Sequence, residues 1–312
     1  MTIATGGGRR LAVTGATGFL GSAVVRFLTA AGYSIVRITR SPSGKGTDAV
    51  SWDPDRDQLD GTRLEGLDGV VHLAGESIAQ RWTPSARRRI LDSRVRGTAL
   101  LARTLAALDR PPSVLVSASA VGYYGDRGGE EMTEASSPGK GFLSEVTRAW
   151  EEAASPANRA GIRVVHPRFG MVLGSGGGAL ARLLPVFKLG LGGKLGSGRQ
   201  WMSWVALADA VRVVDHLLHE SMLSGAVNVV APQAVTNALF TTTLGRVLRR
   251  PAIFTVPGAA LRLVYGQMAD ETLLSGQRVS PLRLVDSGFI FRHPELEGAL
   301  RAELDARVRA GD

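Results

Sequence analysis

The chain has 312 residues, of which 44% are hydrophobic and 21% charged, a composition that is typical of a soluble globular protein and excludes a disordered chain. It contains no cysteine, which excludes disulfides, thiolate metal sites and a cysteine nucleophile, and which agrees with a cytoplasmic location. The formal net charge is +9, but the arginines are scattered and no nucleic-acid motif accompanies them, so we expect no nucleic acid as partner.

The chain begins with a short glycine-rich segment, residues 1–9, that we expect to be disordered. This segment lacks the apolar centre of a signal peptide, and no run of about 18 apolar residues follows, so we also expect no membrane partner. Apolar runs then alternate with helical patterns, in order at residues 11–14, 19–31, 34–39, 69–74, 85–108, 113–118, 143–154 and 162–168. This alternation predicts an α/β, Rossmann-type fold with a doubly wound parallel sheet.

The first predicted strand leads directly into a glycine motif at the start of a helix. Its glycines are Gly15, Gly18 and Gly21, and Thr17, Phe19 and Leu20 lie among them. Glycine is needed in such a turn because its dihedrals are unusual and because a Cβ would keep the backbone away from a pyrophosphate at the helix N-terminus. Since a strand precedes the motif and an amphipathic helix follows it, the pattern predicts a dinucleotide site.

The end of the second predicted strand selects the cofactor. In dinucleotide sites an acid at this position binds the ribose 2′-hydroxyl, whereas an arginine accommodates a 2′-phosphate. The strand at residues 34–39 is followed by Arg40, with no acid at its end. The sequence therefore favours NADP(H), with a solvated surface arginine as the alternative.

After about residue 174 the chain becomes rich in glycine, at 174–178 and 190–198. We expect a strand that completes the sheet at about 225–232, a helix that begins at Thr236 or Asn237, and one more strand-like patch at 288–291. The predicted organisation is therefore an NADP-binding Rossmann domain over 10–174 and a smaller, mostly helical substrate-side region over 175–312. This region includes a C-terminal helical domain at about 250–300.

Several segments together resemble the extended short-chain dehydrogenase/reductase superfamily, and more specifically its atypical epimerase-like proteins with a C-terminal domain of unknown function. These segments are residues 15–21, 72–76, 117–125, 189–200 and 276–278. The resemblance covers nearly the whole chain. It implies a Rossmann domain that, together with the C-terminal segment, closes over a cleft for a small-molecule substrate.

The resemblance also implies roles for individual residues. Leu73, Ala74 and Gly75, at the end of a central strand, are expected to lie along the cofactor. Glu76 and Arg81 are expected to face its ribose or phosphates. Arg168 begins a stretch that resembles the part of the superfamily that passes the nicotinamide.

The standard catalytic groups of the superfamily are a serine or threonine, a tyrosine, and a lysine four residues after that tyrosine, which lowers the pKa of the phenol. Ser119 is the candidate serine. Phe142 and Val146 stand at the other two positions, and neither can carry a proton. One candidate for the missing acid is Tyr123 or Tyr124. The other is Lys140 or Glu145, at the start of the next helix.

Two functions follow from this departure. The first is an NADP(H)-dependent oxidoreductase or epimerase that acts on a carbinol or carbonyl small molecule, with Ser119 and Tyr123 as its candidate catalytic residues. The second is a non-catalytic NADP(H)-binding sensor or scaffold, which the missing tyrosine and lysine favour. The sequence leaves the substrate and the oligomeric state open.

Other polar and aromatic residues receive simpler interpretations. The five histidines have no paired spacing with acidic residues, so we expect no metal. Trp201 and Trp204 either line the substrate cleft or anchor a loop. Asp209 is expected near the start of a helix, where it positions the helix and takes no part in the chemistry.

Overall fold

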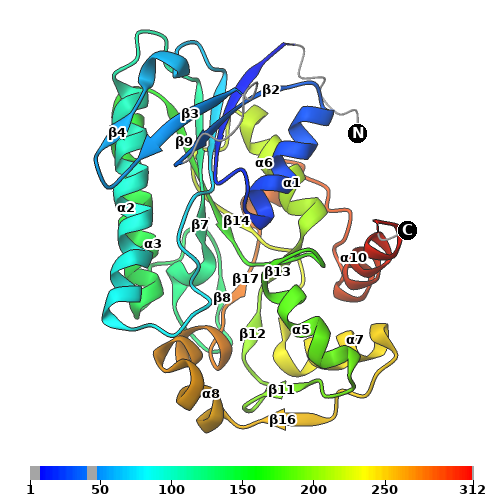
Figure 1. The fold of residues 1–312 in the computed structure, drawn as a ribbon. Helices are drawn as coiled ribbons and strands as arrows, with labels where there is room; N and C mark the ends of the chain where they lie inside the picture. The colour runs from blue at the N-terminus through cyan, green and yellow to red at the C-terminus, as the bar shows by residue number, and fades with distance from the viewer. Residues whose placement is uncertain (1–7, 41–47, 311–312) are drawn as a thin grey trace.

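The computed structural model describes residues 8–40 and 48–310, so the expected disordered start lies almost wholly outside the described residues. The main sheet is built from nine strands. They are β1 (Arg10–Thr14), β2 (Ser34–Thr39), β3 (Ala49–Asp53), β4 (Gln58–Leu59), β5 (Gly69–His72), β6 (Val114–Ser117), β7 (Ser119–Ala120), β9 (Arg163–Phe169) and β14 (Gly225–Val229). Their order is β14-β9-β6-β5-β1-β2-β3-β4, with β7 paired to β9, and every pair is parallel except β3 with β4 (Figure 1). The predicted Rossmann-type, doubly wound parallel sheet is confirmed.

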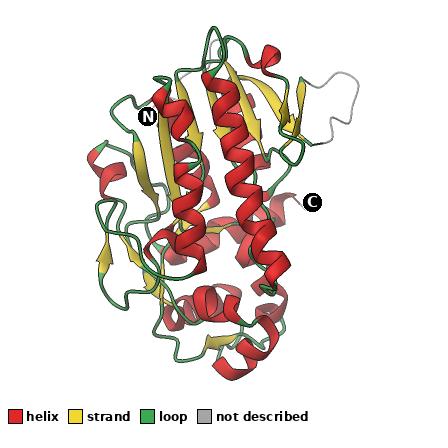
Figure 2. Cartoon of the chain, turned by 90° about the vertical axis from the view of Figure 1, so that its left-hand side faces the viewer, coloured by secondary structure: helices red, strands yellow, loops and turns green. Residues whose placement is uncertain are grey.

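Helices cover both faces of the sheet. One face packs on α1 (Phe19–Ala30) and α6 (Leu207–His219), and the other packs on α2 (Pro84–Ala106), α3 (Phe142–Glu152) and α4 (Ser155–Arg159). Figure 2 looks onto the second face, along which α2 and α3 run side by side. Burial from both sides explains why the central strands are continuous apolar runs. None of the described helices is long and apolar enough to cross a bilayer.

The strands β3 and β4 escaped the sequence-based prediction. In β3 the side chains of Val50 and Trp52 are 1% and 4% exposed, whereas Ser51 between them is exposed. This alternation is the signature of a half-buried strand, but it extends over only five residues next to a polar turn. The short pattern was therefore too weak to stand out.

The second half of the chain, together with β8 from the first half, forms short strand pairs and helices below the carboxyl ends of the main sheet (Figure 1). The strand pairs are β10 (Met171–Leu173) with β13 (Trp204–Ala206), β11 (Gly193–Leu195) with β16 (Phe254–Val256), β12 (Trp201–Met202) with β15 (Val235–Thr236), and β8 (Glu131–Met132) with β17 (Arg278–Val279). The helices are α5 (Gly178–Lys188), α7 (Asn237–Leu248), α8 (Gly258–Tyr265), α9 (Leu282–Asp286) and α10 (Leu296–Ala310). Shorter helical turns are η1 (Gly61–Leu64), η2 (Val121–Tyr124) and η3 (Ala269–Leu273).

The strand expected at 288–291 is wrong, because the chain between α9 and α10 passes as a loop. Its apolar residues pack against each other and do not pair with a strand. The rings of Phe289 and Phe291 meet edge to face with centroids 5.0 Å apart. Asp209 holds the residues that follow. Its buried carboxylate accepts hydrogen bonds from the backbone N–H groups of Arg292 and His293, at 2.9 and 2.8 Å, and from Arg212 at 2.9 Å. This carboxylate therefore ties the C-terminal segment to α6.

Replacement of Asp209 by alanine is expected to lower the free energy of unfolding by about 3 kcal/mol, because three donors lose a buried acceptor that ties the C-terminal segment to α6. Urea denaturation measures the change. The matched control is Asp286→Ala, since Asp286 is exposed and close to the same segment. Equal stability of the two variants would contradict the role assigned to Asp209.

Candidate cofactor and active site

The turn between β1 and α1 is built for close backbone approach. Gly15 has φ +67°, and a Cβ on it would come within 2.9 Å of the backbone of Leu73 and Ala74. A Cβ on Gly21 would collide with the carbonyl oxygen of Gly15. Gly18 begins α1 without a side-chain cap, and no acidic residue lies in the first turn. The positive end of this helix is therefore open to an anion.

Thr14 and His72 hold the ends of β1 and β5 together beneath this turn. The hydroxyl oxygen of Thr14 accepts from the backbone N–H groups of Leu73 and Ala74 at 3.1 and 3.2 Å, so its hydrogen is free to donate to Nδ1 of His72 at 2.7 Å. Nε2 of His72 then donates to Thr98 at 2.9 Å. Burial lowers the pKa of His72 to about 4, so the imidazole is neutral in the folded protein. The backbone of Leu73 and Ala74, expected to lie along the cofactor, is thereby fixed.

The remaining residues expected at the cofactor lie around this turn. Thr17 is exposed, Phe19 and Leu20 are half-buried, and the ring of Phe19 packs against the glycine-rich loop 174–178. Arg40 is exposed directly after β2.

The segment after β5 is anchored by arginines from several elements. Arg94 on α2 donates to the carbonyl of Glu76 at 2.9 Å and lies against Gly75. Burial lowers the pKa of Arg94 to about 10. Arg81 donates to the carbonyls of Leu263 and Val264 on α8, at 2.7 and 3.2 Å. Sequence reasoning misses Arg94, because one arginine in an arginine-rich helix carries no sign that it is buried.

Ser119 belongs to a buried charged cluster. Its hydroxyl donates to Oε1 of Glu151 at 2.6 Å, and Arg168 binds both oxygens of the same carboxylate at 2.8 Å each. Burial favours a neutral Glu151, but the hydrogen bonds and charge of Arg168 outweigh it and hold the pKa of Glu151 below its usual value. Glu151 is therefore a carboxylate, and sequence reasoning did not find it.

Two tyrosines flank Arg168. The guanidinium carbon lies 3.4 Å from the ring centroid of Tyr123. Tyr124 is buried, accepts from Arg168 at 3.0 Å and donates to Asn228 at 2.7 Å. Burial raises the pKa of Tyr124, so its phenol stays protonated. The half-buried Tyr123, together with Glu151, lines an open groove beside α3.

Matches to known sequence families agree with this geometry. The NAD dependent epimerase/dehydratase family matches residues 11–230, more than half of the chain, and a domain of unknown function (DUF1731) matches residues 256–303. The chain belongs to the NAD-dependent epimerase/dehydratase family.

Relatives in this family extend the likeness over nearly the whole chain. The epimerase family protein Mb2239 of Mycobacterium bovis is 41% identical over 291 residues, which cover 93% of this chain and 96% of the relative. The human epimerase family protein SDR39U1 is 36% identical over 297 residues, 94% of this chain and 98% of that protein. A crystal structure of its isoform 2 with NADPH superposes with a TM-score of 0.87 at 34% identity, over 95% of this chain and 99% of that one.

Apolar packing fills the positions at which standard relatives in the superfamily carry tyrosine and lysine. Phe142 and Val146 are 5% and 2% exposed and pack with Trp82, Ile90 and Met268. Glu271 from η3 reaches the same place and accepts from the backbone N–H groups of Phe142 and Leu143, at 3.1 and 3.0 Å. The C-terminal region therefore covers the start of α3.

The structure also places the other candidate residues, which are the proton-transfer candidates Lys140 and Glu145 and the two tryptophans Trp201 and Trp204. Lys140 and Glu145 are exposed. Trp204 is fully buried and donates from Nε1 to the carbonyl of Gln233 at 3.0 Å, so it anchors its loop, whereas the half-buried Trp201 stacks with Arg278. Within the described residues, no group of three or more histidines and acids is placed to hold a metal ion.

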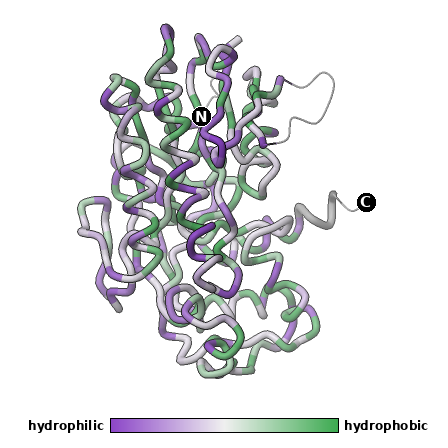
Figure 3. Tube along the Cα trace, turned by 60° about the vertical axis from the view of Figure 1, so that its left-hand side comes forward, coloured by the Kyte–Doolittle hydropathy of each residue, from purple (hydrophilic) through white to green (hydrophobic). Residues whose placement is uncertain are grey.

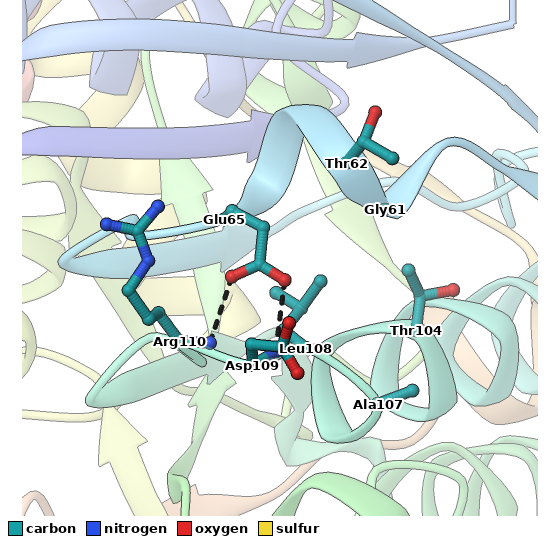
Figure 4. A pocket seen from close by; sticks show the side chains of 8 residues that line it. All are labelled: Gly61, Thr62, Glu65, Thr104, Ala107, Leu108, Asp109 and Arg110. Atoms are coloured by element: carbon teal, nitrogen blue, oxygen red, sulfur yellow. Dashed lines mark hydrogen bonds between the residues drawn. The ribbon is translucent and has the colours of Figure 1, made fainter.

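A hollow at the other end of the strands, away from the glycine turn, has a structural role. Figure 4 shows it between the loops that precede β5 and β6. The carboxylate of Glu65 accepts there from the backbone N–H groups of Asp109 and Arg110, at 3.0 and 2.9 Å. Nucleotides bind at the carboxyl ends of parallel strands, and this hollow lies at the amino ends.

The neutral His72 predicts how stability depends on pH. Its pKa is about 4 when folded, below the usual 6.5, so its contribution is complete above pH 6.5 and is lost as the pH falls toward 4. The loss amounts to about 3 kcal/mol. In His72→Asn the free energy of unfolding, followed by urea denaturation from pH 7 to 4, is expected to change less steeply. A slope equal to that of the wild type would contradict this burial effect.

Proposed function

We propose that the protein binds NADP(H) at the turn between β1 and α1. The observation that carries this proposal is the glycine cradle of Gly15, Gly18 and Gly21 in front of an uncapped helix N-terminus that has no acid in its first turn. The NADPH in the crystal structure of the human relative, at 34% identity, supports it. A side chain on Gly15 or Gly21 would collide with neighbouring protein backbone, so the tight turn that presents the helix N-terminus to a pyrophosphate needs glycine at both positions.

The residues that would hold the cofactor fall into three groups. Gly15, Thr17, Gly18, Phe19 and Leu20 form the pyrophosphate cradle, Leu73, Ala74, Gly75 and Glu76 line its side, and Arg40 meets the 2′-phosphate. Arg81 and Arg168 are positioning residues in this proposal, because their guanidinium groups already bind protein acceptors.

We further propose oxidoreduction or epimerisation of a carbinol or carbonyl small molecule in the cytoplasm. When bound, NADP(H) supplies or accepts a hydride at C4 of its nicotinamide. Ser117 at the end of β6 pairs with His72 at the end of β5. Ser119 follows two residues later, so Ser119, like Leu73, lies at the carboxyl ends of the strands. The only hydrogen of the Ser119 hydroxyl already points at the Glu151 carboxylate. In alcohol oxidation Ser119 accepts the substrate hydroxyl proton while it passes its own proton to Glu151.

Tyr123 contacts the substrate in this proposal. Its ring is fixed by Arg168, and the groove that it lines with Glu151 gives the proton a way to solvent. Reduction of a carbonyl runs the same steps backwards. Because Glu151 is a carboxylate, the proton enters from solvent along this groove and reaches the substrate oxygen through Glu151 and Ser119.

A sensor or scaffold is the second candidate, because one observation favours it. The apolar cluster around Phe142 and Val146 occupies the place of the superfamily's proton-transfer pair. A protein that only binds NADP(H) has no need of such a pair.

Calorimetric titration with NADPH and NADH tests cofactor binding. Arg40→Ala is expected to weaken NADPH binding by roughly 10- to 100-fold, because a charge-assisted phosphate contact is lost, and to leave NADH binding unchanged. The control is Arg37→Ala, an exposed arginine on the same strand. Failure of the wild type to bind either nucleotide would overturn both candidate functions.

A screen of carbonyl compounds against bound NADPH separates enzyme from sensor. For any substrate found, Ser119→Ala and Glu151→Gln are expected to lower kcat about 10²- to 10⁴-fold, since each interrupts the proton route. Ser119→Ala, which leaves the ion pair of Glu151 with Arg168 intact, should leave NADPH affinity unchanged. Tyr123→Phe should act mainly on KM. Turnover that survives in both Ser119→Ala and Glu151→Gln would contradict the route, and tight NADPH binding without turnover across the screen would favour the sensor.

A further inference from the structure

Two loops lie side by side at the end of the molecule farthest from the amino ends of the main sheet (Figure 1). They comprise residues 188–194 and 249–254, which we call the basic tip. β11 and β16 pair in parallel with Gly193 opposite Phe254, and Gly190 lies beside Pro251. The two loops therefore form one continuous surface.

The basic tip exposes large apolar side chains. Leu189 is 75% exposed, Leu191 56%, Ile253 82% and Phe254 49%. In Figure 3 hydrophobic stretches accordingly appear along this end of the trace. Single exposed apolar residues are ordinary, but four on adjacent loops make a patch of the kind that marks an interaction site.

The same surface is positively charged. Lys188, Arg249 and Arg250 are exposed, and none of them takes part in an ion pair among the described residues. The sequence places no acidic residue between Glu152 and Asp209 or between Glu220 and Asp270. Both loops lie inside these acid-free stretches.

We infer that the basic tip docks on the surface of an anionic lipid bilayer. Projecting apolar side chains enter the boundary between headgroups and acyl chains, while adjacent basic groups meet the lipid phosphates. A symmetric contact with a second copy of this chain would instead bring Lys188, Arg249 and Arg250 against like charges. Charge complementarity therefore selects the lipid surface.

This inference revises the expectation of no membrane partner. That expectation came from the absence of a long apolar segment, which bears on spanning a bilayer and says nothing about surface contact. The basic tip shares no residue with the proposed NADP(H) site, so the two proposals can fail separately.

Sedimentation with lipid vesicles tests the inference on the full chain. The protein is expected to bind vesicles of phosphatidylcholine mixed with phosphatidylglycerol at least about tenfold more tightly than phosphatidylcholine alone, and to be released by salt. The double variants Leu189→Ser with Ile253→Ser, and Arg249→Gln with Arg250→Gln, should each weaken binding about tenfold or more. The matched control is Met222→Ser, which removes an 83% exposed apolar side chain elsewhere.

Thermal denaturation and NADPH titration of the same variants, expected to match the wild type, show that folding and the cofactor site are intact. Protein that stays in the supernatant with the anionic vesicles would overturn the inference. So would equal loss of binding in Met222→Ser, or a tip-dependent dimer in light scattering without vesicle binding.

Discussion

The closeness of the β1–α1 turn to the end of β5 is the constraint on which the rest of the site depends. The backbone of Gly15 lies so near Leu73 and Ala74 that no side chain fits between them, and Gly21 is held against the carbonyl of Gly15 in the same way. Thr14 and His72 fix this approach from below with buried hydrogen bonds. Because both strand ends are fixed before any ligand arrives, binding a dinucleotide there costs little ordering of the protein.

The buried cluster of Ser119, Glu151 and Arg168 shows how charge is kept inside this fold. Burial acts against the charge of both partners, yet two hydrogen bonds of 2.8 Å and the contact with Tyr124 outweigh it, and the pKa of Arg168 is raised. Such a pair needs every polar atom satisfied, since removal of one partner leaves an uncompensated charge. The pair also orients the Ser119 hydroxyl, so the charge cluster and the proposed proton route are one arrangement.

The sequence predicted those parts of the fold and site that depend on local pattern. The glycine motif, the apolar runs of the central strands and the absence of tyrosine and lysine at Phe142 and Val146 can all be read from neighbouring residues. Glu151 and Arg94 could not be found in this way, because their roles depend on burial and on partners far away in the chain, and the same residue types are common on exposed helix faces. Phe289 and Phe291 misled the prediction, since two aromatic residues suit a packed loop as well as a strand.

Amide hydrogen–deuterium exchange, followed by mass spectrometry with and without NADPH, tests the central claim most directly because it locates the ligand on the chain. We expect slower exchange at Thr17–Ser22 and at Leu73–Glu76 when NADPH is present, with little change around Glu65 and Arg110. Unchanged exchange at the β1–α1 turn, or protection confined to the amino ends of the strands, would contradict a cofactor site at this turn.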